Sequence, residues 1–199
     1  MAWLHAVEVR GARGPGQDCA AVIDLGDALV VVLADGAGGT GGGDVAADAI
    51  IAAVRATASS HPSWSDVIEE LDRSPLLGGG QATAVIATLT AAGVRGASVG
   101  DSGAWLVRGA AVEDLTRAQE RKPLVGSGAA ATPFGCGPLD GATLLVASDG
   151  LLKYAPRADI ARLASQDDLA AAARALVALV RLPGGDRQDD VSVILCRSR

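Results

Sequence analysis

Hydrophobic and polar residues alternate along the first segment of the chain, residues 3–10, and this pattern predicts a β-strand. Residues 19–35 hold two apolar runs separated by the tight turn 25–27, so we expect a β-hairpin and not a strand with a crossover helix. The second run, residues 28–33, contains no polar residue. The chain therefore begins with strands.

Three later segments are expected to form helices. Residues 44–58 carry aspartates in the first turns, where the helix dipole favours them, and a helix over 63–74 has Ser63 or Ser65 as its cap. A Ser-x-x-Asp pattern predicts a third helix from Ser165. The apolar faces of the first and third helices consist of Ala46, Ala47, Ile50, Ile51, Val54 and Ala58, and of Leu169, Ala173, Leu176, Val177 and Val180.

The middle of the chain reads as strands and loops. Short apolar runs separated by turn residues fill 81–116 and predict an antiparallel meander, whereas 117–141, rich in Gly, Pro and Ala, predicts a surface loop or flap. Further strands are predicted at 142–148 and 191–196. Because strands and helices come in blocks and do not alternate strictly, antiparallel sheets covered by helices are favoured.

Composition narrows the class of protein. The 199 residues fit one domain, 1–199, and a core of Ala, Val, Leu and Ile, since 49% of residues are hydrophobic but only 3% aromatic. A net charge of -6 without runs of like charge argues against nucleic acid or a membrane surface as partner. Three scattered cysteines, no signal-peptide pattern and no long apolar span place the protein in the cytoplasm.

The glycine-rich stretch "LADGAGGTGGGD", residues 33–44, invites a nucleotide-binding interpretation, because Gly36, Gly38 and Gly41 satisfy G-x-G-x-x-G. A Rossmann unit needs a second parallel strand ending in an acid about 20 residues later, where this chain has the polar turn 59–66. No Lys-Ser or Lys-Thr follows the glycines, so the P-loop pattern fails too. The alternatives that remain are a plain tight connection and a role for Asp35.

Aspartates stand at the ends of several predicted strands. A carboxylate at the end of a fully apolar strand is costly unless a cation meets it, and each alone is commonly a turn residue. Together, with two histidines and no cysteine pair, they indicate a hard, oxygen-ligated Mg²⁺ or Mn²⁺ site. The residues are Asp18, Asp35, Asp101, Asp149 and Asp189.

Five blocks in order, "RGPGQD", "ADGAGG", "VGDSG", "ASDGL" and "DDVSVIL", span the chain nearly end to end. They resemble the metal-dependent serine/threonine protein phosphatases, the type 2C or PPM family. The resemblance implies an α+β fold, a four-layer α-β-β-α sandwich of two antiparallel sheets flanked by helices. The trypsin-like interpretation of "GDSG" fails because neither histidine is suitably placed upstream.

The resemblance also implies residue roles. It makes Asp35 the acid that bridges two metal ions and Gly36 the donor of a carbonyl ligand. Asp149 and Asp189 would complete the ligands of the first metal. The remaining implied roles are Asp18 as holder of metal-bound water, Asp101 as ligand of a third metal, and Arg13 as the grip on substrate phosphate.

The implied activity is hydrolysis of phosphoserine or phosphothreonine by water activated between two, or with the third site three, Mn²⁺ or Mg²⁺ ions. The implied partner is a phosphorylated protein, opposite a Ser/Thr kinase, and we expect a monomer. Three departures from the family pattern, Gln17, Ala37 and Gly103, keep open an alternative: a phosphatase-like module that binds a phosphoprotein without turning it over.

Overall fold

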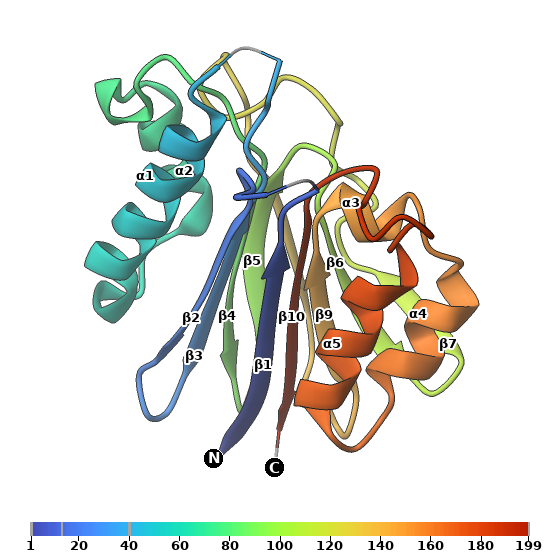
Figure 1. Cartoon of the computed structure of the whole chain (residues 1–199). Helices are drawn as coiled ribbons and strands as arrows, with labels where there is room; N and C mark the ends of the chain where they lie inside the picture. The colour runs from blue at the N-terminus through green and yellow to red at the C-terminus, as the bar shows by residue number, and fades with distance from the viewer. Residues whose placement is uncertain (1, 13, 40, 199) are drawn as a thin grey trace.

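Two five-stranded antiparallel sheets pack face to face in the computed structural model, which describes residues 2–12, 14–39 and 41–198 (Figure 1). The first sheet has the order β1 (Trp3–Arg10), β10 (Val191–Ser198), β9 (Thr143–Ala147), β6 (Gly103–Arg108), β7 (Ala111–Asp114). The second sheet has the order β2 (Cys19–Asp24), β3 (Leu29–Ala34), β4 (Ala84–Thr90), β5 (Gly93–Val99), β8 (Thr132–Cys136).

Helices cover the outer face of each sheet. The second sheet is covered by α1 (Gly43–Thr57) and α2 (Trp64–Asp72), and the first by α3 (Asp149–Leu152), α4 (Arg157–Ala164) and α5 (Leu169–Leu179) (Figure 1). Short 3₁₀ turns follow α1 and α2, at Ala58–Ser60 and Pro75–Leu77. The predicted four-layer α-β-β-α sandwich is therefore confirmed.

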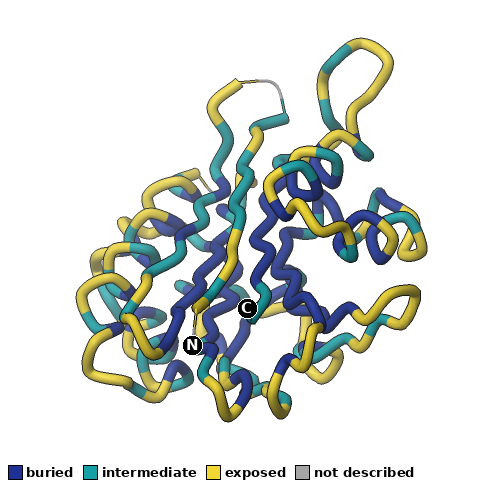
Figure 2. Tube along the Cα trace, turned by 90° about the horizontal axis from the view of Figure 1, so that it is seen from below, coloured by how far each residue is buried: buried dark blue, intermediate teal, exposed yellow. Residues whose placement is uncertain are grey.

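Strand β3 shows how the core is built. Its alternate residues face opposite ways: Leu29, Val31 and Leu33 pack against the other sheet, and Val30 and Val32 pack beneath α1 and α2. All five are fully buried, which explains why the strand carries no polar residue. Burial of each such side chain contributes roughly 1.5–3 kcal/mol, and Figure 2 shows the buried segments gathered in the interior with exposed segments around them.

Several sequence predictions are confirmed. β1 coincides with residues 3–10, β2 and β3 pair as the predicted hairpin, and α1 lies where its apolar face indicated. Of the two candidate caps for α2, Ser63 is used, since its side chain accepts a hydrogen bond from the Asp66 amide. The third predicted helix starts later than expected: Asp168 caps α5, and Ser165 ends α4.

The predicted meander over 81–116 is wrong in its pairing. β4 and β5 belong to the second sheet, and β6 and β7 to the first, so the chain changes sheets between Val99 and Gly103. Gly100, whose φ is +95°, supplies the sharp turn. Spacing alone cannot distinguish four consecutive strands in one sheet from two hairpins in different sheets.

The predicted loop 117–141 contains an unpredicted edge strand, β8. Pro133 and Gly135 within it mask the strand pattern, and an edge position tolerates the missing proline N–H. Helix α4 was also not predicted, although it is amphipathic and begins directly after Pro156. Among the described residues, no helix combines the length and the apolar character needed to cross a membrane.

Candidate metal centre

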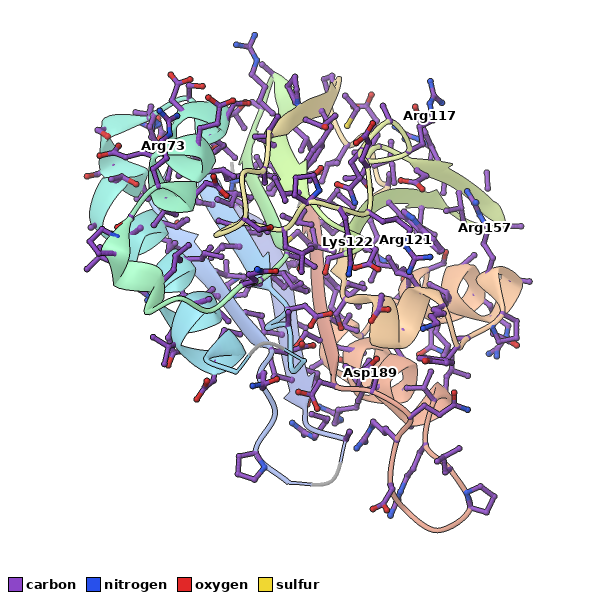
Figure 3. All side chains as sticks on the ribbon, turned by 90° about the horizontal axis from the view of Figure 1, so that it is seen from above. Arg73, Arg117, Arg121, Lys122, Arg157 and Asp189 are labelled. Atoms are coloured by element: carbon purple, nitrogen blue, oxygen red, sulfur yellow. The ribbon has the colours of Figure 1, made fainter. Side chains whose placement is uncertain are left out.

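The sheet topology brings the predicted acids to one edge of the sandwich. Because β2 and β3 are antiparallel and Cys19 pairs with Ala34, the flanking residues Asp18 and Asp35 lie at the same end. The same relation between β9 and β10 places Asp149 and Asp189 together, since Ala147 pairs with Val193. Residues far apart in the sequence therefore share one site, on which Figure 3 looks from above.

Asp18 is the most deeply buried of these acids, with 5% of its surface exposed. Neither of its carboxylate oxygens has a hydrogen-bond partner of good geometry among the residues that the structure describes. Burial raises the pKa of Asp18 to about 6, although the nearby hydroxyls of Ser192 and Ser148 act in the opposite direction. A buried carboxylate without partners requires a proton or a cation to offset its desolvation.

Asp35 experiences the strongest repulsion. Burial first, and then the charges of Asp18, Asp149 and Asp189 in that order, together raise the pKa of Asp35 to about 9. The three neighbours come from different strand ends, so the pKa of Asp35 reports that the carboxylates face one another. In a protein without bound cations, Asp35 keeps a proton at neutral pH.

Two of the less buried acids, Asp149 and Asp101, each approach a cation. Burial, and then Asp101 and Asp189, raise the pKa of Asp149, while Lys153 lies 3.9 Å from its carboxylate. Asp101 lies at the crossing between the sheets and pairs with Arg121 at 2.7 Å. Its carboxylate is thus held by an arginine at the place where the resemblance implies a third metal ligand.

The glycines after Asp35 allow close backbone packing. A Cβ on Gly36 would lie 2.5 Å from the backbone carbon and oxygen of Gly43, so any side chain there would collide with the start of α1. Gly42, the residue that caps α1, has φ of +72°, which favours glycine. The loop is a tight connection and also fixes the direction in which Asp35 and Gly36 point.

Hydroxyl groups connect the two sheets beneath the acids. The Asp35 amide donates to the Thr83 hydroxyl at 3.1 Å, and that hydroxyl lies 2.7 Å from the one of Ser102, next to Asp101. Both hydroxyls are buried. The strand end that carries Asp35 is therefore linked to the turn that carries Asp101.

Sequence reasoning missed Asp190. Its two carboxylate oxygens accept hydrogen bonds from the amides of Ala12 and Gln17, at 2.7 and 2.6 Å. A Cβ on Gly16 would lie 2.6 Å from the same carboxylate, so the contact also requires glycine there. The Asp-Asp doublet at 189–190 was the available signal: one acid faces the site, and the other closes the loop 12–17.

Three further positions were singled out in the sequence: Arg13, Gln17 and Ala37. Arg13, the expected phosphate ligand, is not among the residues that the structure describes. The Gln17 amide oxygen lies 2.9 Å from the position of a Cβ on Gly38, so Gln17 faces the glycine loop. Ala37 offers only a methyl side chain, which cannot donate a proton.

As they stand, no three His, Cys, Asp or Glu side chains within the described ranges are grouped closely enough to hold a metal ion. The donor set nevertheless fits hard divalent cations, because it consists of carboxylates around the partnerless oxygens of Asp18. Asp189, the most exposed of these acids, lies at the solvent-facing side of the group.

Comparison with known proteins places the chain in a protein family. The model of the family Stage II sporulation protein E (SpoIIE) matches residues 26–199. The chain belongs to this family. The SpoIIE match includes Asp35, Asp101, Asp149 and Asp189 but begins after Asp18 and the loop 12–17. No curated protein matches the chain.

Solved structures share the fold over the whole length. A bacterial serine phosphatase carrying a point mutation is 21% identical with a TM-score of 0.83, covering 100% of both chains. PppA, described as a regulatory component of the type VI secretion system in Pseudomonas aeruginosa, is 22% identical with a TM-score of 0.79, covering 100% of this chain and 99% of that one. The catalytic domain of the serine/threonine phosphatase PstP, in complex with 2 manganese ions, is 19% identical with a TM-score of 0.77, covering 98% and 97%.

These structural similarities establish the fold of this SpoIIE-family chain. They also confirm the resemblance to PPM-type phosphatases that the sequence motifs indicated.

We predict that the metal-free protein loses stability as the pH rises from 5 to 8. The folded-state pKa of Asp35 is about 9 against an ordinary 3.8, so the folded chain keeps a proton that the unfolded chain releases. This stability is complete below pH 4 and is lost as the pH rises toward 9. Urea unfolding in a chelator should give a free energy of unfolding that is lower at pH 8 than at pH 5 by on the order of 4 kcal/mol, since one proton contributes about 1.4 kcal/mol per pH unit. Asp35→Asn should remove most of that difference, and a constant or rising stability in the wild type would contradict the account.

We also predict that Asp190→Ala destabilises the protein, because two amides lose a charged acceptor. The free energy of unfolding should fall by on the order of 3 kcal/mol, measured by urea denaturation. Asp190→Asn, which keeps one carbonyl acceptor, should fall between wild type and Asp190→Ala. The matched control is Asp27→Ala, in the exposed turn between β2 and β3; equal effects of the two alanine variants would show that Asp190 does not close the loop.

Proposed function

We propose that the protein is a metal-dependent phosphatase that hydrolyses phosphoserine or phosphothreonine in proteins, with residues 1–199 acting as one catalytic domain. The observation that carries the proposal is Asp18: a buried carboxylate without hydrogen-bond partners among the described residues, beside an Asp35 that three other acids repel. Its family and its phosphatase-like fold support the same conclusion. The partners would be phosphoproteins whose modification a Ser/Thr kinase makes.

Four side chains and one carbonyl would hold the ions. Asp35, Asp149 and Asp189 would hold them together with the Gly36 carbonyl, and Asp18 would act through water. Two bound Mn²⁺ or Mg²⁺ ions would lower the pKa of a shared water molecule and offset phosphate charge. Manganese is the first choice for assay, because the PstP domain with this fold was solved with 2 manganese ions.

The substrate phosphate would be oriented by the loop that Asp190 closes. Arg13 belongs to this loop by sequence, and a guanidinium can bind two phosphate oxygens at once. Asp190 draws the two ends of the loop, Ala12 and Gln17, together beside Asp189. The contact between Asp190 and this loop would therefore position the phosphate-binding arginine, Arg13, relative to the metal ligands.

The oxygen of the leaving group must receive a proton, and the residue at position 37 cannot supply it. Some PPM-type phosphatases carry a histidine at this position, and Ala37 removes that donor. Solvent water can serve, because the site lies at the open edge of the sandwich and Asp189 is exposed. We expect the rate to depend on the leaving-group pKa, with aryl phosphates hydrolysed faster than alkyl phosphates.

A second candidate function is recognition of a phosphoprotein without turnover. It is favoured by Ala37 and by the ion pair between Asp101 and Arg121, which uses a carboxylate that a third ion would need. Calorimetry separates the two. Two Mn²⁺ ions bound at millimolar metal support the enzyme, and tight phosphopeptide binding without bound metal supports the module.

We predict that hydrolysis of a phosphothreonine peptide requires Mn²⁺ and falls at least about 100-fold in Asp149→Asn, because the variant loses an anionic ligand. The assay measures phosphate release at pH 8 with Mn²⁺ and with a chelator. Asp167→Asn, which changes an exposed acid in the connection between α4 and α5, is the matched control and should retain wild-type activity. Equal activity of wild type and Asp149→Asn with Mn²⁺ present would overturn the proposed function.

A further inference from the structure

One carboxylate outside the group of acids holds a whole loop. The Oδ1 atom of Asp72, the last residue of α2, accepts hydrogen bonds from four successive backbone amides at 2.8 to 3.1 Å. The donors are Gly126, Ser127, Gly128 and Ala129. Partial burial acts to raise the pKa of Asp72, but the four amides outweigh it and lower the pKa below its ordinary value. Asp72 is therefore charged at neutral pH and binds the loop 124–129 to the end of α2.

The backbone of this loop is shaped to receive an anion. Gly126 and Gly128 have φ of +94° and +88°, in the left-handed region that favours glycine. Successive N–H groups in such a turn can converge on one negatively charged group. Val125 and Ala129 are buried in the same hydrophobic cluster as Leu71 of α2. The loop thus has one position relative to α2, set by charge on one side and by packing on the other.

The same loop pairs with the segment that carries the proposed metal ligands. Val125 and Ala82 exchange two backbone hydrogen bonds, at 3.0 and 3.2 Å. Ala82 in turn forms an antiparallel bridge with Gly36, and the Thr83 amide donates to the Asp35 carbonyl at 2.8 Å. Three short segments therefore lie side by side beyond the ends of β3 and β4. The middle one connects the loop held by Asp72 to the chain at Gly36.

This pairing fixes the direction of the Gly36 carbonyl. The peptide group between Gly36 and Ala37 is trans, so its N–H and C=O point in opposite directions. The Ala37 N–H donates to the Gln81 carbonyl at 2.8 Å, on the side of β4. β2 lies on the other side of β3 from β4, and Asp18 directly precedes β2. The Gly36 carbonyl therefore faces the side of the site on which Asp18 lies.

We propose that Asp72 is a positioning residue for the metal centre. It holds the loop 124–129, the loop pairs with Ala82, and Ala82 keeps the Gly36 carbonyl directed toward the side of Asp18. This inference rests on the proposed function, which makes that carbonyl a ligand of the ions. Asp72 acts through backbone pairing, so its loss changes how well the ligands are placed and leaves every ligand present.

The test measures the Kd for Mn²⁺ by calorimetry in the wild type and in two variants. In Asp72→Ala the four amides lose their acceptor, and the Kd should rise at least about tenfold, as is usual when an outer partner of a metal ligand is removed. In Asp72→Asn, which keeps one carbonyl acceptor, the rise should be smaller. At saturating Mn²⁺ the kcat for p-nitrophenyl phosphate should return close to the wild-type value, because the ligands themselves are intact.

The matched control is Asp168→Ala. The Asp168 carboxylate also accepts a backbone amide, that of Ala171 at 3.0 Å, but it caps α5 on the outer face of the first sheet. This variant should lose stability in urea and keep the wild-type Kd for Mn²⁺. An unchanged Kd in Asp72→Ala, or an equal rise in both alanine variants, would overturn the inference. Asp72→Asn gives the same comparison if Asp72→Ala does not fold.

A readout without metal separates failure of the inference from failure of the proposed function. If the wild type binds no Mn²⁺ and hydrolyses no phosphate ester, the proposed function fails. Hydrogen exchange followed by NMR in metal-free protein then decides the inference alone. Relative to the buried Val31 amide, the Ala37 and Val125 amides should exchange roughly tenfold faster in Asp72→Ala but not in Asp168→Ala. Unchanged relative exchange of the Ala37 amide in Asp72→Ala contradicts the inference.

Discussion

Mutual repulsion among carboxylates at one edge of the sandwich is the constraint on which this structure depends. Asp18 and Asp35 are largely removed from water, and Asp149 and Asp189 add negative charge beside them. The folded protein can tolerate this arrangement if one of the acids is protonated or if cations bind. The raised pKa of Asp35 means that, without cations, Asp35 is the acid that keeps a proton. A site of this kind destabilises the empty protein at neutral pH and gains stability when divalent ions bind.

The rest of the fold holds those acids in place against that repulsion. Strand β3 is buried on both faces, so Asp35 stands at the end of a rigid support. The glycines after it admit the start of α1 at backbone distance. Asp190 closes the loop 12–17 on the other side. Rigid strands thus carry the proposed metal ligands, while loops carry the proposed substrate contacts.

The sequence was most informative where local pattern and tertiary burial agree. β1, the hairpin of β2 and β3, and helix α1 follow from alternation, turn residues and an apolar face. The change of sheet at Gly100 was not predictable, because pairing between strands is a property of packing. β8 was missed because Pro133 interrupts a pattern that an edge strand tolerates.

The candidate site was also predictable from the sequence only in part. Strand ends and ordered blocks predicted Asp18, Asp35, Asp101, Asp149 and Asp189 as site residues, but the partners of these residues depend on contacts between distant segments. The hydrogen bonds that Asp190 accepts join it to residues that are 178 and 173 positions away in the sequence. The ion pair of Asp101 with Arg121 comes from a loop without any periodic signal.

The most direct test of the metal centre is anomalous diffraction at the manganese edge from crystals grown with Mn²⁺. The account predicts two strong peaks within bonding distance of the Asp35 carboxylate, with Asp149 and Asp189 as further ligands of one ion, and their loss in Asp35→Asn. The absence of any peak at Asp35 in the wild type at millimolar Mn²⁺ would contradict it.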